Sequence, residues 1–276
     1  MRRSCSGSRA FVDTCMIDCL PRRVCHAHAL VMIGLFALAP LSRTQAASVG
    51  TAPLILYASN VSKAAIEPLV PICARASGVE VQAQYANNPA VAKAIAEGAH
   101  FDLAVIETRM LKDLSDKTLV AKNSIRPLAA LRMALATRES GPDPRMDTVP
   151  AFKRALRGAR SIGYIGNGHS GEVFLDIVGR LKLRGDLAGK LVPFSGAYAE
   201  AAQASERLQY VVAPFFNPLP APLRLVGHFP ASLGADVDVS VGASPGAPAA
   251  AARFIACLGS PDARAIFKDK GYRLDN

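Results

Sequence analysis

The chain has 276 residues, half of them apolar and 6% aromatic, with a formal net charge of +10. This length and apolar content suffice for one large domain or two small ones around real cores. The basic residues are scattered and aromatic residues are few, which argues against a nucleic-acid-binding surface.

The first 46 residues differ from the rest and are expected to be a secretory signal, 1–46. Arg22 and Arg23 precede an uncharged apolar run, 27–41, which is too short to favour a membrane-spanning helix. Thr44 and Ala46 have the small side chains that signal peptidase requires, so cleavage is expected after Ala46. Removal of this segment takes away six arginines and two aspartates, and the net charge falls from +10 to +6. The mature protein is expected to be soluble and periplasmic.

Four of the six cysteines lie in the predicted signal, which leaves Cys73 and Cys257. In an oxidising compartment these two could pair. Two buried thiols are the favoured interpretation, because cysteine is among the most frequently buried residue types.

In the first part of the mature chain, strands are expected at 54–58, 79–85 and 101–107. A helix is expected over 62–76, where apolar residues recur on one face. Pro68 lies inside that span, as does Pro71, and these prolines are expected to bend or break the helix.

The second connection carries clear helix signals. Asn88 is expected to be the N-cap, with Pro89 at the first helical position and Gly98 just past the end.

A second set of elements follows. Strands are expected at 131–137, 160–165 and 208–213, with helices near 148–157 and 171–183. The proline-rich segment 213–224 is too rigid for the interior of a sheet. A strand at 237–243 and two helices complete the chain, the last helix capped by Ser260 and opened by Pro261. The alternation predicts an α/β architecture with a largely parallel sheet.

Gly166, Gly168 and Gly171 form a G-x-G-x-x-G pattern between a strand and a helix. A dinucleotide site needs an acidic residue at the end of a strand about 20 positions on, and Asp186 lies in a helix end and turn instead. A hydrolase elbow needs G-x-S-x-G, but Glu172 occupies the place of the last glycine. A strand, a loop with small side chains and a helix N-terminus can also hold an anion. The alternative is a turn with no ligand, in which glycine only allows the backbone to bend, and on this stretch alone the two interpretations are even.

The same arrangement recurs at 57–64 and 85–105. Together with "SGVEVQAQYA", "GAHFDLAV", "ALRGARSIGYI" and the closing "FIACLGSPDARAIFKDKGY", the chain resembles the periplasmic molybdate-binding proteins of ABC transporters. The resemblance implies an α/β, two-lobed periplasmic-binding-protein-like fold of type II with two crossings between the lobes. Lobe 1 is expected at 48–130 plus 228–276, and lobe 2 at 131–227.

In that family two lobes close over a tetrahedral oxyanion, which is held by hydroxyl and backbone N–H donors. The resemblance places the ligand-binding positions on the following residues: Ser59, Asn60, Asn87, Asn88, His169, Ser170 and Tyr198. Asn87 and Asn88 replace the serine-rich second loop of the family. A tyrosine of the family has no match, because Pro214 or Phe215 stands there.

Each position has a structural alternative. Ser59 and Asn88 are placed where helix caps occur, and His169 is an exposed loop residue in the commoner case. Glu107, near the expected cleft, could repel an anion or pair with Arg109. Because asparagine offers an acceptor as well as donors, a protonated oxyanion or a small organic acid is also plausible.

The expected function is capture of a small molybdate- or tungstate-like oxyanion and its delivery to an inner-membrane ABC permease, by binding and hinge closure. No cofactor is expected, and the protein is expected to be a monomer. Alternatives are a different ligand in the same fold, delivery to a membrane receptor, and an exported serine hydrolase using Ser170 and His228. No metal site is expected, because the histidines of the mature chain are far apart and no Cys/His spacing matches zinc.

Overall fold

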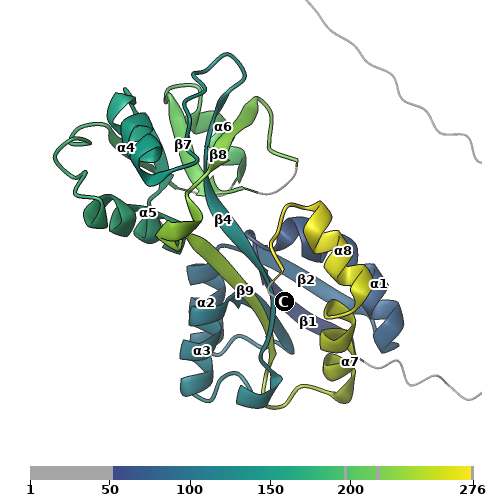
Figure 1. Cartoon of the computed structure of the whole chain (residues 1–276). Coiled ribbons are helices and arrows are strands. Elements are labelled where there is room, and N and C mark those ends of the chain that lie inside the picture. Colours follow the sequence, from purple (N-terminus) through teal and green to yellow (C-terminus); the bar gives the residue numbers. More distant parts are fainter. Residues whose placement is uncertain (1–51, 196–197, 216–217, 275–276) are drawn as a thin grey trace, which may run out of the picture. The chain divides into compact units, whose positions relative to one another are not determined.

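The computed structural model describes residues 52–195, 198–215 and 218–274. The predicted signal, 1–46, lies outside the described residues. Within these residues, nine strands form a mixed sheet in the order β2-β1-β3-β9-β4-β7-β5-β6, with β8 paired to β4. The fold is α/β with two lobes, as expected (Figure 1). The expectation of a largely parallel sheet is wrong, because β4 pairs antiparallel with β7, β8 and β9. Among the described helices, none combines the length and the apolar character needed to cross a membrane.

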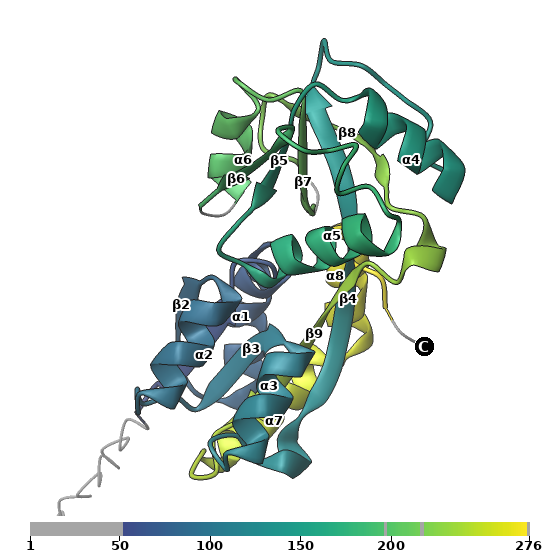
Figure 2. The ribbon, with the colours of Figure 1, turned by 90° about the vertical axis from the view of Figure 1, so that its left-hand side faces the viewer.

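Lobe 1 is built on β1, β2 and β3, which run parallel, and on β9, which is antiparallel to β3. Its strands are β1 (Leu54–Ser59), β2 (Val81–Ala86), β3 (Leu103–Glu107) and β9 (Asp236–Ala243). Its helices are α1 (Lys63–Ser77), α2 (Asn88–Ala96), α3 (Thr108–Asp116), α7 (Ala249–Leu258) and α8 (Pro261–Asp269), with a 3₁₀ turn at Lys122–Ser124. Helices α1, α7 and α8 cover one face of the sheet, and α2 and α3 cover the other (Figures 1 and 2).

Lobe 2 is built on β5, which is parallel to both β6 and β7. Its strands are β5 (Ile162–Ile165), β6 (Leu191–Phe194), β7 (Tyr210–Pro214) and β8 (Leu223–His228). Its helices are α4 (Val149–Gly158), α5 (His169–Arg180) and α6 (Tyr198–Ala204), and a 3₁₀ turn at Ala231–Leu233 precedes β9. One apolar cluster lies under α4 and α5, and a second lies under α6.

Strand β4 (Arg126–Arg138) belongs to both lobes. Its first half pairs with β9, and its second half pairs with β7 and β8. Near the change of partner, Ala130 also exchanges two 2.8 Å backbone hydrogen bonds with Arg273 of the C-terminal segment. The chain crosses between the lobes through β4 and through the segment that leads into β9. The exact limits expected for the lobes, 48–130 with 228–276 and 131–227, remain a prediction.

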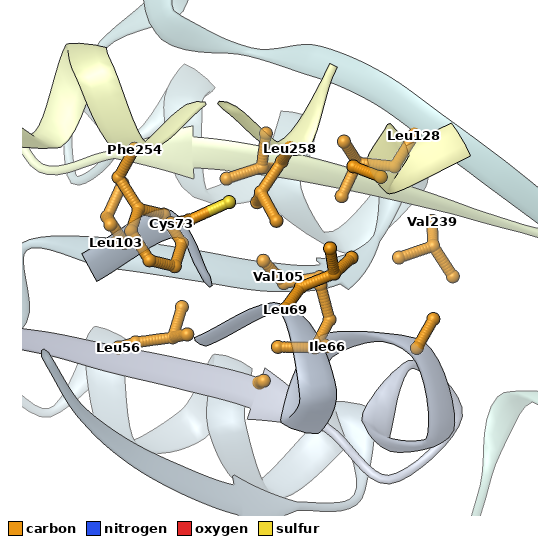
Figure 3. Close-up of a cluster of buried hydrophobic side chains, with 14 of the residues drawn as sticks. Leu56, Ile66, Leu69, Cys73, Leu103, Val105, Leu128, Val239, Phe254 and Leu258 are labelled. Carbon is orange, nitrogen blue, oxygen red and sulfur yellow. The ribbon is translucent and has the colours of Figure 1, made fainter. Parts of the chain in front are cut away.

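Cys73 and Cys257 form a disulfide, so the expectation of two separate buried thiols is wrong. Their Cα atoms are 5.5 Å apart, and the bond joins α1 to α7 across a sequence separation of 184. Figure 3 shows Cys73 beside Leu69, Phe254 and Leu258 in the apolar cluster of lobe 1. Residue type predicts only that each cysteine is buried. Pairing depends on the packing of α1 on α7, which places the two cysteines side by side.

Helix α1 runs through both Pro68 and Pro71, so the expectation of a break is wrong. Both prolines lie on the exposed side of the helix, where water can bond the carbonyls that lose their intrahelical partners. The opposite side is anchored by the buried residues Ala65, Ile66, Leu69, Cys73 and Ser77.

The sequence signals that mark helix α8 are confirmed: Ser260 is its N-cap and accepts a hydrogen bond from the Ala263 N–H at 3.2 Å. Strands β6 and β8 were not expected. Strand β6 contains Pro193, which is tolerated because β6 is an edge strand.

Candidate anion-binding site

Three helix N-termini meet at one small pocket. The turn before α1, the start of α2 and the start of α5 all contribute to its wall. Its lining residues are Asn60, Val61, Asn87, Asn88, Pro89, Ile165, Gly168, His169, Ser170, Pro214 and Val237. The first N–H groups of a helix have no partner inside the helix, and the helix dipole is positive at that end. The wall is therefore electrically suited to negative charge.

The glycines of the third loop bring α5 close to β5. A Cβ atom on Gly171 would lie 2.0 Å from the backbone oxygen of Ile165, and one on Gly166 would lie 2.7 Å from Cβ of Pro193. At Gly168, the N-cap of α5, a Cβ would meet Cγ2 of Ile165 at 3.2 Å and Oγ of Ser170 at 3.9 Å. The pattern thus serves close packing of a helix start on a strand end, which puts Ser170, 9% exposed, at the pocket.

The two asparagines of the second loop have different roles. Asn87, not Asn88, is the N-cap of α2, and its Oδ1 accepts from the Ala90 N–H at 2.8 Å. The expectation that Asn88 is the cap is wrong by one position, because Pro89 is the second helical residue. Asn88 is 6% exposed, and its Oδ1 accepts from the Glu107 N–H at 3.1 Å. Both amide oxygens accept a backbone N–H, and the Nδ2 groups are the donors that these two side chains have left.

The first loop brings Asn60 to the pocket but not Ser59. Ser59 is fully buried, and its hydroxyl donates to Oγ of Ser62 at 3.2 Å. Ser62 in turn donates to the Ser59 carbonyl at 2.8 Å and occupies the N-cap position of α1. Ser59 is therefore neither a helix cap nor a lining residue, and it supports the turn that presents Asn60 and Val61.

Beside the pocket, a charged group joins the two lobes. Nε2 of His169, in α5, lies 3.0 Å from Oε1 of Glu107, at the end of β3. Nδ1 of His169 lies 2.8 Å from Oε2 of Glu172. Arg109 completes the group, 3.8 Å from Glu107 and 3.9 Å from Glu172. Burial raises the pKa of the Glu107 carboxyl above its ordinary value, while His169 and Arg109 act in the opposite direction. The expected pairing of Glu107 with Arg109 is present, but the contact with His169 is shorter.

Of the seven expected ligand positions, five line the pocket: Asn60, Asn87, Asn88, His169 and Ser170. Tyr198 begins α6, and its side chain lies outside the described residues. Sequence reasoning missed the apolar wall formed by Val61, Ile165 and Val237. Pro214, noted only as the replacement of a family tyrosine, is part of this wall.

The hydrolase alternative gains no support. Ser170 and His228 line different pockets, and in the described part of the chain no hydrogen bond joins them. Within the described ranges, no group of three or more His, Cys, Asp or Glu side chains is placed to hold a metal ion.

Residues 54–273 match the family described as bacterial extracellular solute-binding protein. This chain belongs to that family. No curated protein sequence matches this solute-binding protein.

Solved structures share its fold at low identity. The periplasmic molybdate-binding protein of Azotobacter vinelandii is 17% identical to this chain, with a TM-score of 0.65. The superposition covers 81% of this chain and 100% of that protein. Peb3 from Campylobacter jejuni is 20% identical with a TM-score of 0.64, over 80% and 100% of the two chains. The sulfate-binding protein SubI from Mycobacterium tuberculosis is 14% identical with a TM-score of 0.66, over 82% and 88%. At these identities the likeness establishes the fold alone.

Proposed function

We propose that this protein binds a small, fully ionised oxyanion in the periplasm and delivers it to an inner-membrane ABC permease. The observation that carries this proposal is the pocket at which three helix N-termini meet. The molybdate- and sulfate-binding proteins named above have the same fold, which supports an oxyanion as the ligand class.

The chemistry of the wall favours an anion without protons of its own. Asn87 and Asn88 present N–H donors because their oxygens are already bonded, and Ser170 adds a hydroxyl. Among the described residues that line this pocket there is no Asp, Glu, Lys or Arg. Oriented neutral donors offset the cost of removing water from an anion and still allow its release.

The size of the pocket agrees with a small ligand. The space that the centre of a water molecule can reach is about 40 Å³. A tetrahedral oxyanion is of this order of size, whereas a sugar or a peptide is much larger.

The test is a thermal-shift panel of molybdate, tungstate, sulfate, phosphate and small carboxylates. A ligand at a hundredfold excess over its dissociation constant stabilises the folded protein by about 2.7 kcal/mol, so a true ligand raises the unfolding temperature clearly. We expect molybdate or tungstate to give the largest rise. A panel in which no anion raises the temperature would contradict the proposal.

A small organic acid is the second candidate. Val61, Ile165, Pro214 and Val237 give the pocket an apolar side that a bare oxyanion does not need. A rise with a carboxylate and none with the inorganic oxyanions would keep the binding function and change the ligand.

A further inference from the structure

His169 lies at the pocket, but its two ring nitrogens are already engaged. Each lies within hydrogen-bond distance of a carboxylate oxygen, Glu107 at 3.0 Å and Glu172 at 2.8 Å. Nη2 of Arg109 also lies 3.3 Å from Nδ1. Both ring nitrogens of His169 therefore have partners within the protein.

The two carboxylates differ in burial. The Glu107 side chain is 6% exposed and that of Glu172 is 72% exposed. Water weakens an exposed ion pair strongly and a buried one much less. Oε2 of Glu107 is buried without a hydrogen-bond partner, so Oε1 and its contact with His169 are the main interaction that this carboxylate makes. The Glu107–His169 contact therefore dominates the group.

This contact also spans the two lobes. Glu107 ends β3 and Arg109 begins α3, both in lobe 1, whereas His169 and Glu172 lie in the first turn of α5, in lobe 2. In addition, the Glu107 N–H is bonded to Asn88, which lines the pocket. A change in the distance between Glu107 and His169 thus accompanies any opening of the pocket along this side.

We propose that the contact of Glu107 with His169, flanked by Glu172 and Arg109, latches the two lobes together beside the pocket, and that His169 gives the ligand no hydrogen bond. In this role Glu107 is a positioning residue that acts through His169. The proposal rests on the proposed binding function, because the latch matters only if the pocket opens and closes around a ligand.

The variants that test the latch are E107Q and H169Q, each of which removes one partner of the contact. The control D176N removes an exposed ion pair with Arg180 within the same helix as His169 and leaves the contact in place.

The measurement is small-angle X-ray scattering of these proteins without ligand. E107Q and H169Q are expected to have a larger radius of gyration than the parent and D176N. H169Q provides the test if E107Q folds poorly. Equal radii in the parent and H169Q would overturn the latch. Since no ligand is present, this result is separate from success or failure of the anion panel.

Discussion

Gly171 lies where α5 starts against the end of β5. A side chain there would bring Cβ to 2.0 Å from the Ile165 carbonyl oxygen, and a backbone atom cannot move aside as a flexible side chain can. We expect Gly171→Ala to lower the free energy of unfolding by about 1–3 kcal/mol, as overpacking does elsewhere, and to displace the start of α5 from the pocket.

Gly158 provides the matched control. It ends α4, and a Cβ atom there meets nothing within 4 Å. Gly158→Ala is expected to be neutral or to stabilise by up to about 1 kcal/mol, because alanine restricts the unfolded chain. Urea unfolding of both variants measures the difference, and equal stabilities would contradict the close-packing role of Gly171.

Asn88 combines a structural bond with a pocket-facing donor. Asn88→Asp keeps an oxygen for the Glu107 N–H but replaces the amide N–H groups with negative charge. We expect the protein to remain folded and its affinity for the best anion of the panel to fall at least about tenfold, since a hydrogen bond to a charged group contributes about 1.5–3 kcal/mol. Calorimetric titration measures this change.

Asn123→Asp is the control for that variant. Asn123 is exposed in the 3₁₀ turn at Lys122–Ser124 and does not line the pocket, so this variant adds the same charge without removing a pocket donor. A loss of affinity in Asn123→Asp as large as that in Asn88→Asp would show a general effect of charge instead of a specific lost donor.

At the scale of the elements, the disulfide between α1 and α7 has the largest predicted effect on stability. It closes a loop of 184 positions, and a bond across a long loop restricts the unfolded chain most, giving about 2–5 kcal/mol. The double variant Cys73→Ser, Cys257→Ser is expected to lose this amount of unfolding free energy in urea titrations. If the parent were equally stable with and without reductant, the assigned contribution would be wrong.

Most elements could be predicted from local signals. Alternating apolar residues marked the strands, and the Ser260–Pro261 pair marked α8 because a cap and the first turn are adjacent in sequence. The failures concern partners far apart in sequence. Strand β8 exists because β4 pairs with it, and α1 survives its prolines because its other face is buried. Neither fact can be read from a short window of sequence.

The candidate site divides in the same way. The three loops could be found from glycine, asparagine and serine placed before helices. The contact of His169 with Glu107 could not, because the two residues come from different lobes and are 62 positions apart. Ser59 is buried and donates to Ser62 instead of lining the pocket, and this depends on how the turn folds, not on residue type.

For the whole molecule, β4 determines how the lobes unfold. One continuous strand pairs with β9 in lobe 1 and with β7 and β8 in lobe 2. Loss of either sheet removes partners from this strand, so we expect a single cooperative transition. Calorimetry should give equal calorimetric and van't Hoff enthalpies, whereas two resolved transitions would mean that the lobes are thermodynamically independent.

The order of the elements along the chain also determines when lobe 1 can be completed during synthesis. The described chain begins and ends in lobe 1, and all of lobe 2 is inserted between β4 and β9. A chain made from its N-terminus can complete lobe 2 while lobe 1 still lacks β9, α7 and α8. Cys73 can therefore pair with Cys257 only after β4, all of lobe 2 and β9 have been made. The disulfide is thus a late covalent event, which follows the synthesis of lobe 2 and joins α1 to α7.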